Sequence, residues 1–466
     1  MVRPKEQVTV ARTGLRQASG EGNPGAEAPG AASPERVRAL EAERQSLVAL
    51  LNILRAGEPA SRQDLEREAR LGRAVVTDRL ATLSAFGLVD EGGVGRSIGG
   101  RAPRLVRFRA EAARILVANI NAETIGVGLA DLGGRLILEH YEDFSLAMPP
   151  ELVLERLESL FEWSLGNDGA PLWAISLGVP SATERAEGAR LAFPRLGALP
   201  AWDEARLAQR LARRFGVPIW VHSAVQMETM GEVAALPERL RRDMIYVDLG
   251  AEISTGIVMD GRLNRGTQGL AGQLGHVFAG HAASSKVCGC GNVGCLRTVA
   301  GCEAIAQSGL EAARAGQSRY LAETLAQTGA VTVADIGMAA RFGDAFCADL
   351  LAQSGRLVGT VLATLVNVLN PAFIVLGGEL AQTGDICLAA IREGIYRHAQ
   401  PLVSRDISIV RSRLGRSAGL SGAASLVLGE LFAPDFLEDW LVEGTPLAHP
   451  EVAALLAEAD VSSARA

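Results

Sequence analysis

The 466-residue chain has no apolar run of about 18 residues, the length that a membrane span requires. Its first residues, MVRPKEQVTVARTGLRQ, also contain no apolar core of the kind that directs export. These absences predict a cytoplasmic protein with no membrane association. Lysine is scarce as well, with two residues, and the net charge of −7 excludes a uniformly basic nucleic-acid binder. A basic patch confined to one segment remains compatible with this average.

Cysteine is sparse but unevenly distributed. Three of the six cysteines lie in CGCGNVGC, at Cys288, Cys290 and Cys295, and the other three are scattered through apolar stretches. In a reducing compartment, such a cluster indicates a metal site before a disulfide.

The N-terminal part divides into a polar tail and a helical segment. Residues 1–33 are rich in Gly, Ala, Pro, Glu and Ser without periodicity, which predicts disorder. From residue 34, leucines at helical spacing predict a helix that Gly57 and Pro59 end. In the following SRQDLEREARLGRAVVTDRLATLSAFGLV, Ser61 is a predicted N-cap and Gly72 breaks the pattern between two short helices. This is a helix-turn-helix pattern.

A basic loop follows the helix pair. Two predicted strands flank the glycine-rich GRSIGGRAP, and residues 33–110 hold 14 arginines against 10 acidic residues. We therefore predict a winged helix-turn-helix over residues 34–110, with the second helix in the major groove of a palindromic operator. Its alternative is a solvated arginine-rich loop. The predicted DNA contacts are Arg73, Ala74, Thr77, Asp78 and Arg79 on the helix and Arg96, Arg101 and Arg104 on the wing.

Two points of this DNA interface follow from general chemistry. Asp78 is a discordant acid in it, which either accepts from a cytosine amine or pairs with an arginine. One helix-turn-helix covers half a site, so a homodimer or homotetramer is expected.

From residue 111 the pattern changes to alternating strands and helices with glycine-rich turns, typical of an α/β domain. Two similar strand-turn-strand units, near residues 117–134 and 245–261, suggest a duplicated core with two lobes around a cleft. We place the lobes at residues 111–235 and 236–432. The extension over residues 433–466 either caps this domain or frays.

Several motifs together resemble the ROK family (repressors, open reading frames and kinases), in particular its xylose- and N-acetylglucosamine-repressor-like branch. They are SRQDL, LGRAVVTDRL, GLV and GGRAP, then GTQGLAGQLGH, CGCGNVGCL and NPAFIVLGG, over about residues 40–430. The resemblance implies a two-lobed sugar-kinase-like domain of the actin/hexokinase, ribonuclease-H-like type. It also implies a structural Zn²⁺ beside the sugar cleft, for which the Cys3His set suits a closed tetrahedral shell. The expected ligands are His276, Cys288, Cys290 and Cys295, with His281 as the alternative imidazole.

The resemblance also shows where kinase chemistry is missing. Kinases of the family place Asn-Asp, with the aspartate as base, where this chain has His222 and Ser223, and a serine hydroxyl is no base near neutral pH. Gln273 and Arg297 replace two glutamates that bind sugar hydroxyls in the family, and Asn121 and Glu252 depart from its phosphate loops.

The polar residues left in the predicted cleft are candidates for binding an effector. They are His222, Ser223, Gln273, His276 and Arg297, with Glu228 and Glu232 on the following helix less favoured. Since Arg297 exchanges a negative for a positive charge, an acidic or phosphorylated sugar is favoured. Arg297 either binds this acidic ligand or pairs with an acid of the protein. The alternative for the whole pocket is that it is vestigial and binds nothing.

The whole pattern predicts a transcriptional regulator of carbohydrate genes, most simply a repressor, with a catalytically inactive sensor. Its rivals are an ATP-dependent sugar kinase with an accessory N-terminal domain and a scaffold without ligand or activity.

Overall fold

The computed structural model describes residues 34–94, 104–121, 124–143, 148–179, 183–184, 195–196, 204–237, 240–250, 252–280 and 286–461. Two compact units are distinguished, residues 1–43 and 44–466, and every element below except the first turns of α1 belongs to the second. The predicted disorder of residues 1–33, and the predicted contacts Arg96 and Arg101, lie outside the described residues.

The N-terminal elements are three helices and a small antiparallel sheet of order β1-β3-β2. They are α1 (Pro34–Ala56), β1 (Ala60–Ser61), α2 (Arg62–Ala69), α3 (Arg73–Ala85), β2 (Val89–Val94) and β3 (Arg104–Phe108). As predicted, Ser61 caps α2: its hydroxyl accepts from the Asp64 backbone, and the Asp64 carboxylate accepts in return from the Ser61 backbone N–H. Leu51, Leu65 and Leu83 are fully buried between the helices. This order and pairing are consistent with the predicted winged helix-turn-helix.

The first lobe is built on a five-stranded sheet of order β10-β7-β4-β5-β6. β4, β7 and β10 are parallel, whereas β4, β5 and β6 form an antiparallel meander. Alternate residues of β4 enter cores on opposite faces, with α4 and α5 on one and α15 on the other. The bounds are β4 (Arg114–Ile120), β5 (Thr124–Asp131), β6 (Leu136–Asp143), α4 (Pro150–Leu165), β7 (Leu172–Val179), α5 (Glu204–Phe215), β10 (Ile219–Ser223), α6 (Ala224–Ala235) and α15 (Ser417–Leu431).

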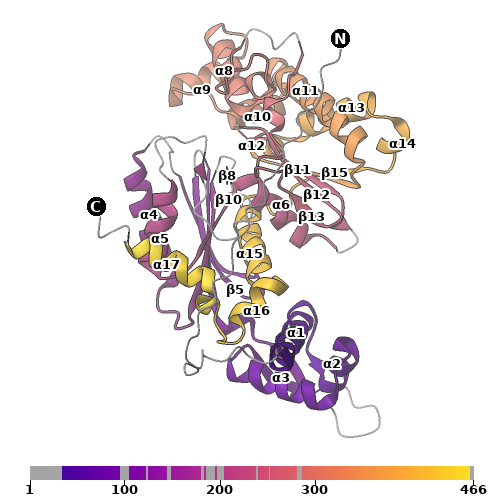
Figure 1. The fold of residues 1–466 in the computed structure, drawn as a ribbon. Helices are drawn as coiled ribbons and strands as arrows, with labels where there is room; N and C mark the ends of the chain where they lie inside the picture. The colour runs from indigo at the N-terminus through magenta and orange to yellow at the C-terminus, as the bar shows by residue number, and fades with distance from the viewer. Residues whose placement is uncertain are drawn as a thin grey trace, which may run out of the picture. The chain divides into compact units, whose positions relative to one another are not determined.

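The second lobe repeats this topology. Its sheet has the order β13-β12-β11-β14-β15, again with the first strand of the meander central and paired in parallel with the next strand. Figure 1 shows helices α8 (Cys302–Arg314) to α13 (Asp385–His398) gathered beside this sheet. The repetition agrees with the predicted duplicated core. Its strands are β11 (Met244–Asp248), β12 (Ser254–Met259), β13 (Arg262–Asn264), β14 (Phe373–Gly377) and β15 (Ser408–Arg411).

The remaining elements belong mostly to the second lobe, and a short ribbon, β8 (Thr183–Glu184) with β9 (Arg195–Leu196), lies in the first. The helices are α7 (Arg297–Ala300), α8 (Cys302–Arg314), α9 (Arg319–Thr328), α10 (Val333–Arg341), α11 (Ala345–Leu369), α12 (Glu379–Gln382), α13 (Asp385–His398) and α14 (Pro401–Ser404).

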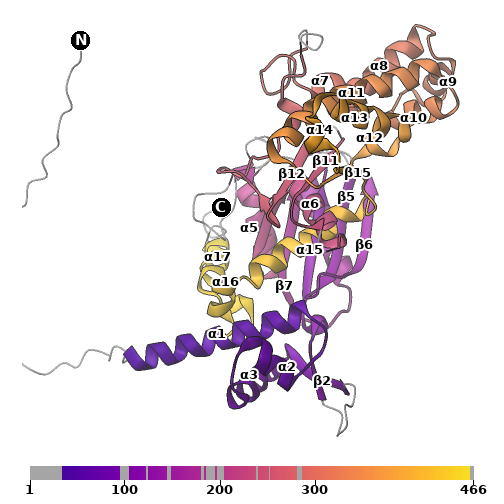
Figure 2. The same cartoon turned by 90° about the vertical axis from the view of Figure 1, so that its right-hand side faces the viewer.

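Helices α6 and α15 cross in close contact, side by side in Figure 2. Glycines make this possible: a Cβ at Gly422 would lie 1.6 Å from the Met227 carbonyl oxygen, and one at Gly231 would lie 2.0 Å from that of Ala418. The two backbones therefore touch without intervening side chains.

The described part of the C-terminal extension, residues 433–461, is folded and packed against the rest of the chain, which is consistent with the predicted cap. It forms α16 (Pro434–Trp440), a 3-10 helix (Pro446–Ala448) and α17 (Pro450–Val461). The Trp440 ring contacts those of Trp173 in β7 and Phe432 at centroid distances of 5.3 and 5.9 Å. Phe432 in turn meets Phe108 of β3 at 6.0 Å. The extension thus shares one hydrophobic core with the N-terminal helices and the first sheet.

In the described part of the chain, no single helix has the length and apolarity to cross a membrane. The bent pair α15 and α16, which meet at 67°, passes this test on length and composition alone.

Candidate metal centre and ligand site

The four predicted metal ligands converge. His276 ends a 3-10 helix (Leu274–His276), and the three cysteines lie on the loop that leads into α7. Isolated bridges between Val287 and Val293 and between Phe278 and Cys295 fold this loop back on itself. Gly291 and Gly294 make the turn with φ of 89° and 80°, where a side chain would be strained.

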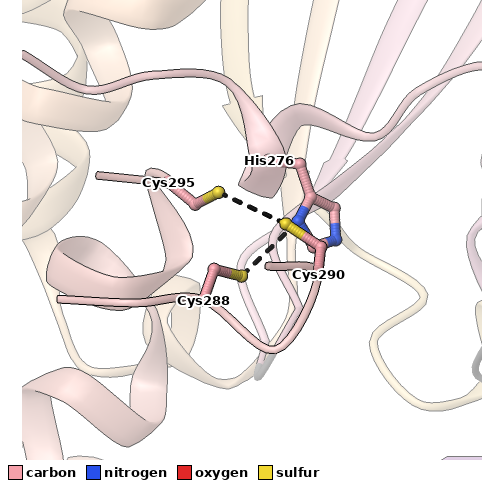
Figure 3. Close-up of side chains that lie close together, drawn as sticks. All are labelled: His276, Cys288, Cys290 and Cys295. Carbon is pink, nitrogen blue, oxygen red and sulfur yellow. Dashed lines mark hydrogen bonds between the residues drawn. The ribbon is translucent and has the colours of Figure 1, made fainter. Parts of the chain in front are cut away.

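The geometry of the quartet suits tetrahedral zinc. The four ligand atoms lie within 4.8 Å of one another, with Cys288 Sγ 3.6 Å from His276 Nδ1 and Cys290 Sγ 3.7 Å from Cys295 Sγ. Figure 3 shows the three sulfurs and the imidazole turned toward a common centre. Zn–S bonds of about 2.3 Å at tetrahedral angles put two sulfurs about 3.8 Å apart, close to the observed separation. His281 lies outside the described residues.

Two predicted effector residues, His222 and Ser223, are buried at the carboxyl end of β10, where α6 begins. Gln273, by contrast, is exposed directly before the 3-10 helix that ends at His276. The metal cluster and Gln273 therefore share one short segment of the second lobe, while His222 and Ser223 belong to the first.

Arg297 is engaged by an acid that the sequence alone did not assign to it. It begins α7, two residues after Cys295, and its guanidinium lies 2.5 Å from a carboxylate oxygen of Glu252. This is the second of the two outcomes expected for Arg297. Because the pair is neutral as a unit, the charge argument for an acidic effector loses its main support.

A cluster of ionisable groups lies where the two lobes meet, and sequence reasoning missed its coupling. The buried Glu228 of α6 lies beside Tyr246 of β11 and Asn119 of β4. Burial and the nearby Asp248 carboxylate raise the pKa of Glu228 well above its usual value. Burial likewise raises the pKa of Asp248 to about 6 and that of Tyr246 well above 10. The cluster therefore favours a protonated Glu228.

The predicted DNA-contact residues of α3 separate into two groups. Arg73, Ala74, Thr77 and Asp78 are exposed on the helix. Arg79 instead lies against the domain: its Nε donates to Ser46 Oγ of α1 at 2.9 Å, and its guanidinium pairs with Asp78 at 2.5 Å. On β3, Arg104 lies 3.4 Å from Glu91 of β2. Asp78 thus pairs with an arginine, one of the two roles foreseen for it.

An open surface groove between α4 and α5 contains none of the predicted site residues. Ion pairs cross it, including Arg210 with Glu158 at 2.7 Å. Its charges are therefore largely satisfied within the protein.

The fold and the site together define a two-lobed α/β architecture of the sugar-kinase type, preceded by three helices and a small antiparallel sheet and carrying a Cys3His cluster. Residues 122–430 match the model of the ROK family, and the chain belongs to that family.

Similar proteins include both regulators and enzymes. The xylose repressor of Caldicellulosiruptor bescii is 26% identical over 379 residues, which are 80% of this chain and 92% of that protein. The DNA-binding transcriptional repressor Mlc of Escherichia coli is 26% identical over 373 residues, covering 78% and 88%. A glucokinase of Halalkalibacterium halodurans is 29% identical over 256 residues, covering 55% and 76%.

Among solved structures, a ROK family transcriptional regulator, a homologue of the E. coli Mlc protein, superposes with a TM-score of 0.71 and 24% identity. The match covers 87% of this chain and 99% of that one. At this identity the likeness establishes the fold.

Proposed function

We propose that this protein is a DNA-binding transcriptional repressor of carbohydrate genes, in which the ROK domain senses a ligand. The observation that carries this proposal is the extent of the similarity to repressors. The alignment with the xylose repressor spans 379 residues, whereas the ROK match runs from 122 to 430, which is 309 residues. The alignment therefore includes chain outside the sugar-kinase-like domain, where α2, α3 and the small sheet lie.

The absence of phosphoryl transfer is part of the same proposal. A sugar kinase needs a carboxylate base at the attacking hydroxyl. Ser223 stands at the position of that base, and the nearest acid of α6, Glu228, is more than one turn further along, buried beside Asn119 and Tyr246. Neither arrangement supports a base at the start of α6.

The Cys3His cluster is the proposed structural zinc site. His276, Cys288, Cys290 and Cys295 would hold the ion, which supplies no open coordination position for catalysis when four protein ligands bind it. Its expected effect is to order the loop between Gln273 and Arg297, next to the proposed ligand site.

The proposed effector is carbohydrate-derived and is contacted by His222, Ser223 and Gln273 around the junction of the lobes. An anionic effector would have to break the ion pair of Arg297 with Glu252, whereas a neutral effector would leave this pair in place. A homodimer or homotetramer on a palindromic site, placed in the cytoplasm with the chromosome, completes the proposal.

The test is selection of bound sequences from random duplex DNA by the zinc-loaded full-length protein, with ATP-dependent phosphorylation of glucose and xylose measured on the same preparation. We expect a two-fold symmetric site bound with a Kd of about 10⁻⁸ M or tighter, and no turnover. The matched control is the double variant Arg73→Ala, Thr77→Ala, whose exposed side chains leave the core intact and whose affinity is expected to fall to the nonspecific level. Turnover without a selected site would replace the repressor with a kinase.

A further inference from the structure

The exposed surface of α3 includes one large apolar side chain, Val75. Val76, Leu80 and Leu83 form its buried row. Val75, in the first turn, instead leaves 37% of its side chain exposed, on a face that the core does not use. In helix-turn-helix proteins the first residues of this helix contact the edges of the bases.

One of the two arginines of α3 is held by contacts within the protein. Arg79 is 15% exposed, and its guanidinium is held by Ser46 and Asp78. The bond to Ser46 joins α3 to α1. Asp78 offers only acceptor atoms, which repel the O6 and N7 acceptors of guanine. The side chains left in the first two turns are Arg73 and the methyl-bearing Ala74, Val75 and Thr77.

Base edges in the major groove carry one apolar group, the 5-methyl of thymine. We propose that Val75 contacts a thymine methyl in each half-site and thereby specifies an A·T pair there. This inference rests on the proposed DNA-binding function and assigns it a specificity determinant. It predicts a half-site in which a thymine methyl is recognised in addition to the contacts of the exposed Arg73.

Substitution of deoxyuridine for each thymine of the selected site tests the proposal, because it removes the methyl and leaves the base pairing unchanged. Burying one methyl corresponds to about a fourfold change in Kd, so we expect a fourfold loss at one thymine per half-site. The variant Val75→Ala is expected to bind the thymine site about fourfold or more weakly and to lose most of its sensitivity to deoxyuridine at one position. Val75→Thr, which keeps one methyl, is the conservative control and is expected to retain part of that sensitivity.

The outcomes distinguish failure of the methyl contact from failure of the proposed DNA-binding function. Failure to select any site contradicts the DNA-binding proposal itself. Tight binding that deoxyuridine leaves unchanged at every position preserves the regulator and overturns the methyl readout. Sensitivity that persists at full size in Val75→Ala overturns the role of Val75, because another residue then reads the methyl.

Discussion

The replacement Trp440→Ala measures how much the C-terminal extension contributes to the fold. The Trp440 side chain is fully buried, packs against Trp173 and Phe432, and its indole N–H donates to the Leu431 carbonyl at 2.9 Å. Truncation of a buried tryptophan costs about 3–5 kcal/mol, and the lost hydrogen bond adds about 1 kcal/mol. We therefore expect the free energy of unfolding to fall by about 5 kcal/mol.

Urea unfolding followed by circular dichroism provides the measurement, because it does not depend on the tryptophans themselves. For an m-value of about 3 kcal/mol/M, the predicted loss shifts the midpoint by about 1.7 M. The matched control is Trp163→Ala: the Trp163 side chain of α4 is 54% exposed, so its removal is expected to change stability by less than about 0.5 kcal/mol.

The contacts of Trp440 also predict where the damage appears. Phe432 contacts Phe108 and lies under the Arg55 guanidinium at 4.7 Å, so the N-terminal helices share the core of the extension. Hydrogen exchange is expected to accelerate in α2 and α3 as well as in the first sheet. Equal midpoints for the two tryptophan variants, or faster exchange confined to α16 and α17, would refute this reasoning.

Three further predictions test the metal centre, the helix crossing and the buried acids. Cys290→Ser is expected to abolish stoichiometric zinc binding, measured by atomic absorption after dialysis. Cys347→Ser, which lies outside the cluster, is expected to retain zinc. A full equivalent of zinc in Cys290→Ser contradicts the site. Gly422→Ala is expected to lower stability by more than about 2 kcal/mol, because the added Cβ would collide with the Met227 backbone. Gly429→Ala in the same helix adds a Cβ with no atom within 4 Å and is expected to raise stability by about 0.5–1 kcal/mol. Thermal melts with the same sign for both would disprove the close crossing. Glu228→Gln is expected to stabilise the protein on the order of 1 kcal/mol at pH 7.5 and much less at pH 4.5. The reason is that the pKa of Glu228 is raised in the folded protein, so ionisation of Glu228 opposes folding once the pH exceeds the ordinary glutamate range. An equal effect at both pH values contradicts this.

The sequence predicted the features that depend on spacing along a short stretch. Cys288, Cys290 and Cys295 are close in the chain, so only His276 had to be brought in from a neighbouring turn to complete the quartet. The N-cap at Ser61 and the break at Gly72 could also be predicted from the sequence, because capping involves residues within one turn of each other. The repeated glycine-rich strand pairs indicated two similar lobes, and the matching strand orders of the two sheets agree with this.

Only the tertiary structure decided how side chains far apart in the chain are used. Arg297 was a candidate for an acidic ligand until Glu252, 45 residues earlier, was found beside it. Arg79 was expected to reach DNA, and Ser46, 33 residues away, holds it against α1. The extension around Trp440 returns to the first sheet near Trp173. Short-range patterns follow from backbone geometry and are written in the local sequence, whereas these pairings depend on which surfaces the whole fold brings into contact.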